Sequence, residues 1–113
     1  MKLQQILNSL QKLHPKEIDL SLDRIKKLCK KLGNPQDNLQ YISVVGTNGK
    51  YSTIQTIRAI LKEANVNCNI YTSPHIQKIN ERYEYNNQEI NDQELSKLLL
   101  KVKEINNNDT ITY

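Results

Sequence analysis

The sequence predicts an α/β fold in which helices flank a parallel sheet, within the one domain, or part of one, that 113 residues allow. An apolar, β-branched run at residues 41–45 has the length of a strand, and the glycine-containing residues 46–50 break it. Apolar side chains at helical spacing follow over residues 52–64, and a second strand-like run covers residues 67–71. A strand, a glycine loop, a helix and a strand form a βαβ unit, whose strands are parallel and whose crossover is right-handed.

Two helices are expected before this unit, in an amino-terminal helical segment over residues 1–35. Apolar side chains recur at helical spacing over residues 3–13, and Pro15 limits that helix. The same spacing over residues 22–32 predicts the second helix, and Gly33 takes the left-handed position that commonly ends one. Both helices are therefore expected to have one apolar face for packing.

Further elements are expected after the βαβ unit. Residues 81–85 and 89–90 flank a turn at Asn86-Asn87. A helix-start box at residues 91–94 precedes an apolar stripe that extends to Ile105. The closing residues 110–113 have the composition of the start of another strand.

The formal charge of +4 raises the question of an anionic partner. The pairs Lys26-Lys27 and Lys30-Lys31 alternate with leucine, which favours the solvated face of a helix; a dedicated anion-binding role is the alternative. A basic nucleic-acid-binding module would need aromatic residues among clustered arginines, and the chain has three arginines in all. We therefore expect no nucleic-acid partner.

The two cysteines, Cys29 and Cys68, lack the spacing of a metal site or a disulfide framework. The amino-terminal residues run directly into an amphipathic pattern, unlike a signal peptide, and no apolar run reaches the roughly 18 residues of a membrane span. We therefore expect a cytoplasmic protein without a membrane partner.

The loop at residues 46–53, GTNGKYST, is the most informative segment. Glycines at the end of a strand let the backbone turn and expose several N–H groups, which bind phosphate together with the positive end of the next helix. Lys50 would add a point charge for the outer phosphates, and Ser52 or Thr53 a hydroxyl for Mg²⁺. The alternative is a strand–turn–helix connection that required glycine and a surface lysine.

The match to the common phosphate-loop template G-x-x-x-x-G-K-[ST] is incomplete. Val44 stands where that template has glycine, and Tyr51 follows the lysine. The position of the loop, after an apolar strand and before a helix, favours the phosphate interpretation and a P-loop-type sheet.

Four segments in order resemble the folylpolyglutamate/dihydrofolate synthases of the Mur ligase superfamily. That family reads G-T-N-G-K-G-[ST], then a strand ending in [TS]-S-P-H, then E-R, with an upstream I-D-L-G-L. This chain has IDLSL at residues 18–22, GTNGKYS at 46–52, TSPH at 72–75 and ER at 81–82. The resemblance covers nearly the whole chain, and the ordered set is more specific than any single motif.

The resemblance implies roles for individual residues. It implies that ATP is bound by Gly46, Thr47, Asn48, Gly49, Lys50 and Ser52, with Lys50 catalytic; that Ser73 binds Mg²⁺; and that the pterin part of a folate substrate contacts Asp19, Leu20, Ser21 and Leu22. Other interpretations are a turn serine at Ser73 and a helix cap at Asp19 or Ser21. Tyr51 and Ser21 each replace a family glycine, and related Mur ligases carry threonine at the first of these positions.

The resemblance implies an ATP-dependent ligase that activates a carboxylate as an acyl phosphate, which the amino group of L-glutamate attacks. The acceptor is dihydropteroate, a (tetrahydro)folate polyglutamate, or both, in folate biosynthesis and one-carbon metabolism. Cofactors are ATP and Mg²⁺, and the complete enzyme is expected to be a monomer with small-molecule partners.

The family also implies that residues 1–113 are a partial ATP-binding domain. The remaining Mg²⁺ ligands, an essential lysine and a carboxy-terminal domain are expected beyond Tyr113, so the chain alone is expected to be inactive. The alternatives are another P-loop ATP-binding protein and a non-catalytic remnant of the ligase.

Overall fold

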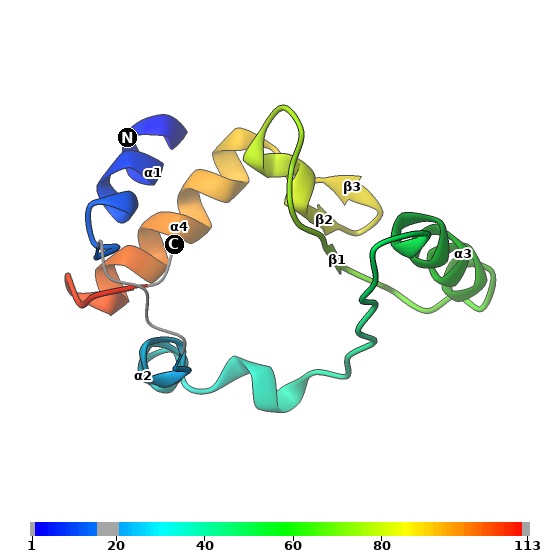
Figure 1. Ribbon diagram of the computed structural model, residues 1–113, viewed down its shortest axis with the longest axis horizontal. Coiled ribbons are helices and arrows are strands. Elements are labelled where there is room, and N and C mark those ends of the chain that lie inside the picture. Colours follow the sequence, from blue (N-terminus) through cyan, green and yellow to red (C-terminus); the bar gives the residue numbers. More distant parts are fainter. Residues whose placement is uncertain (1, 16–20, 112–113) are drawn as a thin grey trace. The chain divides into compact units, whose positions relative to one another are not determined.

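The computed structural model describes residues 2–15 and 21–111, which form two compact units (Figure 1). The first unit contains the residues up to Leu39 and those from Asp92 onward, and the second contains Gln40–Asn91. Neither unit has, among its described residues, a helix long and apolar enough to cross a membrane.

The first unit is a small helical assembly built on α4 (Asp92–Asn106). Both α1 (Leu3–Gln11) and α2 (Asp23–Lys31) contact α4, and α1 lies beside it in Figure 1. The apolar core joins one face of α1 to α4, with buried side chains at Ile6, Leu7, Leu10 and Leu95. These positions follow helical periodicity, so the sequence pattern accounts for this packing.

A polar cluster ties the loop after α4 to α2. The side-chain amide of Asn106, which is buried, donates to the backbone carbonyl oxygen of Asp109 at 2.9 Å. The backbone carbonyl oxygen of Asn106 accepts from the Lys31 ammonium at 2.9 Å. The carboxylate of Asp109 pairs with both Lys31 and Lys27, and their ammonium groups lower its pKa, Lys31 more strongly. Two lysines of the basic helix face thus have a structural partner.

The second unit consists of α3 (Lys50–Glu63), a short turn of 3₁₀-helix at Ile79–Arg82, and a three-stranded sheet. The sheet runs in the order β1 (Ile70–Tyr71), β2 (Tyr83–Tyr85), β3 (Gln88–Glu89). Both pairings are antiparallel.

The β2–β3 hairpin turns at Asn86 and Asn87, whose φ angles are 51° and 65°. Positive φ at both central residues is the geometry of the two-residue turns that best match strand twist. Asparagine occupies all six described non-glycine positions with positive φ, the others being Asn34, Asn65, Asn107 and Asn108. In a chain with only three glycines, asparagine thus takes the left-handed positions at this turn and after the helices.

The prediction of a parallel βαβ unit was wrong for this structure. Residues 41–46 form no strand, and β1 pairs with β2 in antiparallel fashion. The side chains of Tyr41, Ile42 and Val45 are 64%, 65% and 91% exposed. A parallel strand is normally covered on both faces and paired at its edges, and the described residues supply no such cover here, so β-propensity alone does not make a strand.

The other predicted strands are shorter than expected or lacking. The run at residues 67–71 becomes a strand only at Ile70–Tyr71, and residues 110–111 lie outside any strand. All four predicted helices are confirmed within one or two residues of their expected ends.

Candidate nucleotide and metal site

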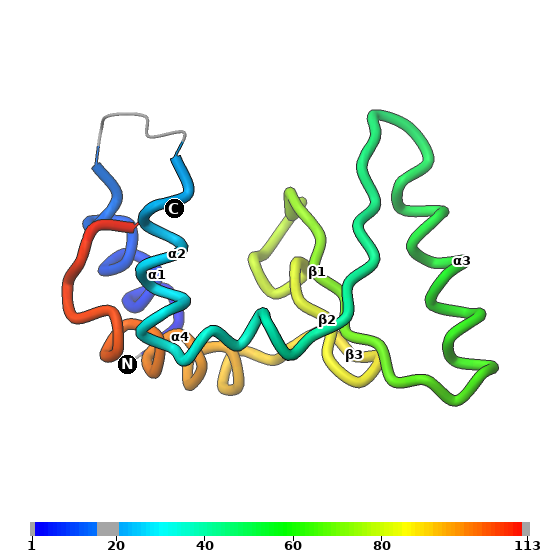
Figure 2. The backbone as a smooth tube through the Cα atoms, turned by 90° about the horizontal axis from the view of Figure 1, so that it is seen from below, coloured from blue at the N-terminus to red at the C-terminus, as the bar shows by residue number. Residues whose placement is uncertain are grey.

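The glycine loop reverses the chain between residues 40–46 and α3, as Figure 2 shows. Gly46 has a φ angle of 153° and Gly49 one of 75°, conformations that L side chains rarely adopt. A Cβ atom at Gly49 would meet no atom within 4 Å. The backbone angle, and not a lack of space, is therefore what requires glycine at the entrance to α3.

The amino-terminal end of α3 is suited to an anion. Gly49 precedes the helix and has no side chain to cap it, and the first backbone N–H groups of any helix lack partners within the helix. The hydroxyl of Thr53 donates to the carbonyl oxygen of Gly49 at 2.9 Å. Ser52 is exposed, and its hydroxyl makes no hydrogen bond within the described structure. The Ser52 hydroxyl can therefore donate to a phosphate or offer lone pairs to a cation, whereas the Thr53 hydroxyl keeps only its lone pairs for a ligand.

The structure brings the predicted phosphate-binding lysine to the predicted metal-binding serine. The ammonium of Lys50 donates to the carbonyl oxygen of Ser73 at 3.4 Å. The hydroxyl of Tyr51 donates to the carbonyl oxygen of Pro74 at 3.5 Å, and the Lys50 ammonium lies 5.6 Å from the centre of the Tyr51 ring. These contacts are long and therefore weak, so an incoming phosphate can displace the ammonium. No motif in the sequence predicts the contact between Tyr51 and Pro74.

Ser73 is exposed in the loop after β1, and its hydroxyl makes no hydrogen bond among the described residues. The described residues contain no group of three or more His, Cys, Asp or Glu side chains placed to hold a metal ion. A hydroxyl is a hard oxygen donor of the kind that Mg²⁺ and Mn²⁺ accept alongside nucleotide phosphates and water. The chemistry of the Ser73 hydroxyl therefore fits a metal ligand beside a nucleotide, and that role stays a prediction.

The predicted pterin-binding segment is described only in part, since Asp19 and Leu20 lie outside the described residues. The hydroxyl of Ser21 accepts from the backbone N–H of Asp23 at 3.4 Å. Leu22 immediately precedes α2 and is 62% exposed. The cap position of α2 thus belongs to Leu22 and not to Ser21, and the substrate interpretation stays a prediction.

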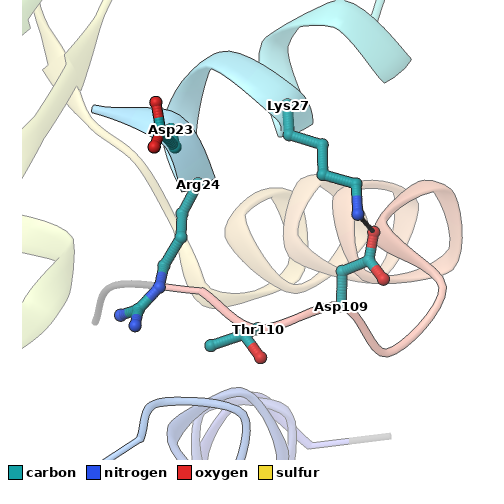
Figure 3. Close-up of a pocket in the computed structure, with 5 residues that line it drawn as sticks. All are labelled: Asp23, Arg24, Lys27, Asp109 and Thr110. Atoms are coloured by element: carbon teal, nitrogen blue, oxygen red, sulfur yellow. Dashed lines mark ion pairs between the residues drawn. The ribbon is translucent and has the colours of Figure 1, made fainter. Parts of the chain in front are cut away.

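A depression beside α2 does not join these residues. It measures about 230 Å³ and is lined by Asp23, Arg24, Lys27, Asp109 and Thr110 (Figure 3). Ligand pockets are usually about 300–1,000 Å³. The dashed line in Figure 3 marks the 3.1 Å ion pair between Lys27 and Asp109, which occupies the lysine that an anion would need. The structure therefore favours the solvated helix face over an anion site here.

Comparisons with known proteins agree with the motifs. No family model matches the chain. It is 36% identical over 107 residues to a dihydrofolate synthase/folylpolyglutamate synthase of Haemophilus influenzae, a match that covers 95% of this chain and 24% of that protein.

Two solved structures share the fold across the whole chain. One is a bifunctional folylpolyglutamate synthase/dihydrofolate synthase from Yersinia pestis complexed with AMPPNP and Mn ion, with a TM-score of 0.86 at 31% identity, covering 100% of this chain and 28% of that one. Another such bifunctional enzyme, with Mn, AMPPNP and L-glutamate bound, has a TM-score of 0.85 at 30% identity and covers 100% and 27%. The chain thus spans about a quarter of the length of the relatives it matches, and it belongs to the folylpolyglutamate synthase/dihydrofolate synthase family.

Proposed function

We propose that this chain supplies the phosphate cradle and one metal ligand of an ATP-dependent ligase that adds L-glutamate to dihydropteroate, a folate polyglutamate, or both. The observation that carries the proposal is the 3.4 Å contact between the Lys50 ammonium and the Ser73 carbonyl, which joins the glycine loop to the loop after β1. The two loops come from motifs 23 residues apart, so their meeting is a property of the fold and not of local sequence.

Each residue has a distinct part in the proposed site. Gly46 and Gly49 allow the turn that presents the backbone N–H groups, and Lys50 supplies a positive charge at the start of α3. Ser73 would help to hold a divalent cation, Mg²⁺ in the cell, which would offset the negative charge of the phosphates. Ser52 would offer a second hydroxyl from the first turn of the helix.

The proposed chemistry transfers the γ-phosphoryl group of ATP to the substrate carboxylate, and the amine of glutamate then displaces phosphate from the acyl phosphate. Lys50 would counter the negative charge that spreads over the transferred group, and the amides of the loop would hold the phosphates in line. Positioning and charge stabilisation are the main contributions that a protein makes to this class of reaction.

We propose that the 113-residue chain alone does not ligate glutamate. It spans 24% of its Haemophilus relative, and the apolar segment that includes Tyr41, Ile42 and Val45 is exposed. In a protein of the relatives' length, we expect residues 41–45 to join a parallel sheet of the ATP-binding domain. We expect that protein to be a cytoplasmic monomer with small-molecule substrates only, with residues 1–113 forming part of the ATP-binding domain.

One observation favours a second candidate, a non-catalytic remnant of the ligase that no longer binds nucleotide. Tyr51 places a large ring in the first turn of α3, where the family has glycine, and the ring lies beside the Lys50 ammonium. A side chain of this size competes with phosphate for the same space and the same charge. The two candidates differ in whether the chain binds nucleotide at all.

Calorimetric titration of the chain with AMPPNP, in the presence and absence of Mn²⁺, distinguishes the candidates. The ligase proposal expects binding that Mn²⁺ strengthens and that Lys50→Ala weakens by roughly tenfold or more. Lys62→Ala, which removes an equal charge at the other end of α3, serves as the matched control and should bind like the unmodified chain. An absence of binding at millimolar nucleotide would favour the remnant.

A further inference from the structure

The proposed function assigns no role to the Glu-Arg motif, and the structure places this motif against the loop that carries Ser73. The carboxylate of Glu81 accepts hydrogen bonds from three consecutive backbone N–H groups, those of Ile76 at 2.8 Å, Gln77 at 3.0 Å and Lys78 at 3.2 Å. Such a set of N–H groups converging on one anion fixes the backbone conformation of the segment that provides them.

Arg82 holds the other end of the same loop. Its carbonyl oxygen accepts from the backbone N–H of Thr72 at 2.9 Å, and its side-chain Nε donates to Nδ1 of His75 at 2.7 Å. Ser73 lies between these two attachment points. The segment from Thr72 to Lys78 is therefore bound to the turn Ile79–Arg82 on both sides of the proposed metal ligand.

We call the hydrogen bonds that Glu81 and Arg82 make to residues 72–78 the polar clamp. These bonds, and not an apolar core, hold the loop. All the buried apolar side chains among the described residues belong to the first unit, and the buried residue of the second unit is Asn80, which is 2% exposed. The side-chain amide of Asn80 donates to the carbonyl oxygen of Ile90 at 2.9 Å. The turn that carries Glu81 and Arg82 is thereby anchored to the residue after β3.

The ionisation of Glu81 agrees with this geometry. The N–H groups of Ile76, Gln77 and Lys78 lower the pKa of its carboxyl group below the ordinary glutamate value. Glu81 is therefore charged at neutral pH, the state in which a carboxylate accepts all three bonds.

We propose that Glu81 and Arg82 are positioning residues of the nucleotide–metal site, which hold the loop 72–78 so that the Ser73 hydroxyl faces a divalent cation before any nucleotide arrives. Neither residue touches the reacting groups; both act through the loop. The inference rests on the proposed function, because it assumes that Ser73 binds the cation. Loss of such supporting contacts around a metal ligand typically costs about 10–100-fold in metal affinity.

The test combines two measurements on the 113-residue chain. Glu81→Gln should speed the amide hydrogen exchange of Ile76, Gln77 and Lys78 without nucleotide present, since a neutral amide holds the three N–H groups less strongly. It should also raise the Kd for Mn²⁺–AMPPNP by about tenfold while the affinity for metal-free AMPPNP stays unchanged. A merely structural role would weaken both affinities together.

Two further variants complete the design. Glu63→Gln removes the same charge from the last residue of α3, which has no contact with the loop 72–78 among those the structure describes, and should leave both affinities unchanged. Arg82→Met should weaken Mn²⁺–AMPPNP binding and Arg82→Lys should restore much of it, because a lysine can again donate to His75. The Arg82 variants decide the matter should Glu81→Gln fail to fold.

The outcomes separate the inference from the function on which it rests. The unmodified chain could bind Mn²⁺–AMPPNP with an affinity that Glu81→Gln and Arg82→Met leave unchanged. That result overturns the positioning role and leaves the proposed function standing. An unmodified chain that binds no Mn²⁺–AMPPNP overturns the proposed function and the positioning role with it. Faster exchange at the three amides with selectively weaker metal–nucleotide binding supports both.

Discussion

The ammonium of Lys50 lies 3.4 Å from the carbonyl oxygen of Ser73, across two loops that are 23 residues apart in the chain. Without a ligand, the lysine rests on a weak neutral acceptor, and a phosphate offers it a charged one. Charge-assisted hydrogen bonds are roughly twice as strong as neutral ones. In the proposed site, a nucleotide phosphate would therefore readily displace the lysine from this contact.

In a full-length ligase that carries this segment, Lys50→Ala should reduce turnover by roughly a hundredfold or more, because the contact strengthens as charge develops on the transferred group. The free energy of unfolding should change by only about 0.5 kcal/mol, as for most surface substitutions. Turnover and the denaturant midpoint are measured on the same two proteins. Unchanged turnover with a large fall in the midpoint would show that Lys50 is structural.

Tyr51→Thr should strengthen AMPPNP binding by the chain. The substitution removes a ring 5.6 Å from the Lys50 ammonium, and such cation–π contacts are worth about 0.5–1 kcal/mol at exposed sites, or roughly two- to fivefold in Kd. Tyr51→Phe keeps the ring and loses the hydroxyl that contacts Pro74, so its Kd should stay near that of the unmodified chain. Calorimetric titration of the three proteins checks the order, and weaker binding by the threonine variant would refute it.

Asp109 should make the stability of the helical unit depend on acid. Lys31 and Lys27 lower the pKa of its carboxyl group in the folded chain, so its stabilising contribution is present above the unfolded-state pKa and is lost as the pH falls through the folded-state pKa. Asp109→Asn should therefore unfold at a lower urea concentration near neutral pH and approach the unmodified chain in acid.

The control for this prediction is Asp37→Asn, which removes a carboxylate from the short turn Pro35–Asn38 of the same unit. Urea midpoints are recorded by circular dichroism across the acidic range. An equal pH dependence for the Asp109 variant and the unmodified chain would mean that the lysine pairs contribute nothing in solution.

Asn87→Ala should lower the free energy of unfolding of the hairpin unit by about 1 kcal/mol, since alanine pays the full steric cost of a left-handed backbone. Asn87 has a φ angle of 65° in the β2–β3 turn. Asn87→Gly, in which that conformation carries no steric cost, is the matched control. Hydrogen exchange of the hairpin amides measures both, and equal protection in the two variants would contradict the turn geometry.

The helices were predictable because their signals are local. Apolar spacing and end residues such as Gly33 define α1 to α4 without reference to distant parts of the chain. The turn at Asn86-Asn87 was predictable for the same reason. The strand at residues 41–45 was not, since a parallel strand depends on partners elsewhere, and the described residues do not provide them.

The candidate site also has parts that local sequence predicts and parts that depend on how distant segments meet. The composition of the glycine loop predicts a phosphate-binding segment, and the resemblance to a known family predicts Ser73 as a metal ligand. The sequence shows Glu81 and Arg82 only as a motif without a role. Their hydrogen bonds run to backbone N–H groups and to His75, and only the conformation of the loop brings these groups within reach. The contact between Tyr51 and Pro74 involves a residue that departs from the family, so no motif foretold it.

Paramagnetic broadening by Mn²⁺ tests most directly whether the glycine loop and Ser73 form one nucleotide–metal site, as we propose. Amide signals of the ¹⁵N-labelled chain are followed while Mn²⁺ is added in the presence of AMPPNP, with Ser73→Ala as the comparison. We expect the amide signals of residues 46–52 and of Ser73 to broaden together, and Ser73→Ala to reduce the broadening at both loops. Broadening confined to one loop, or to neither, would contradict this proposal.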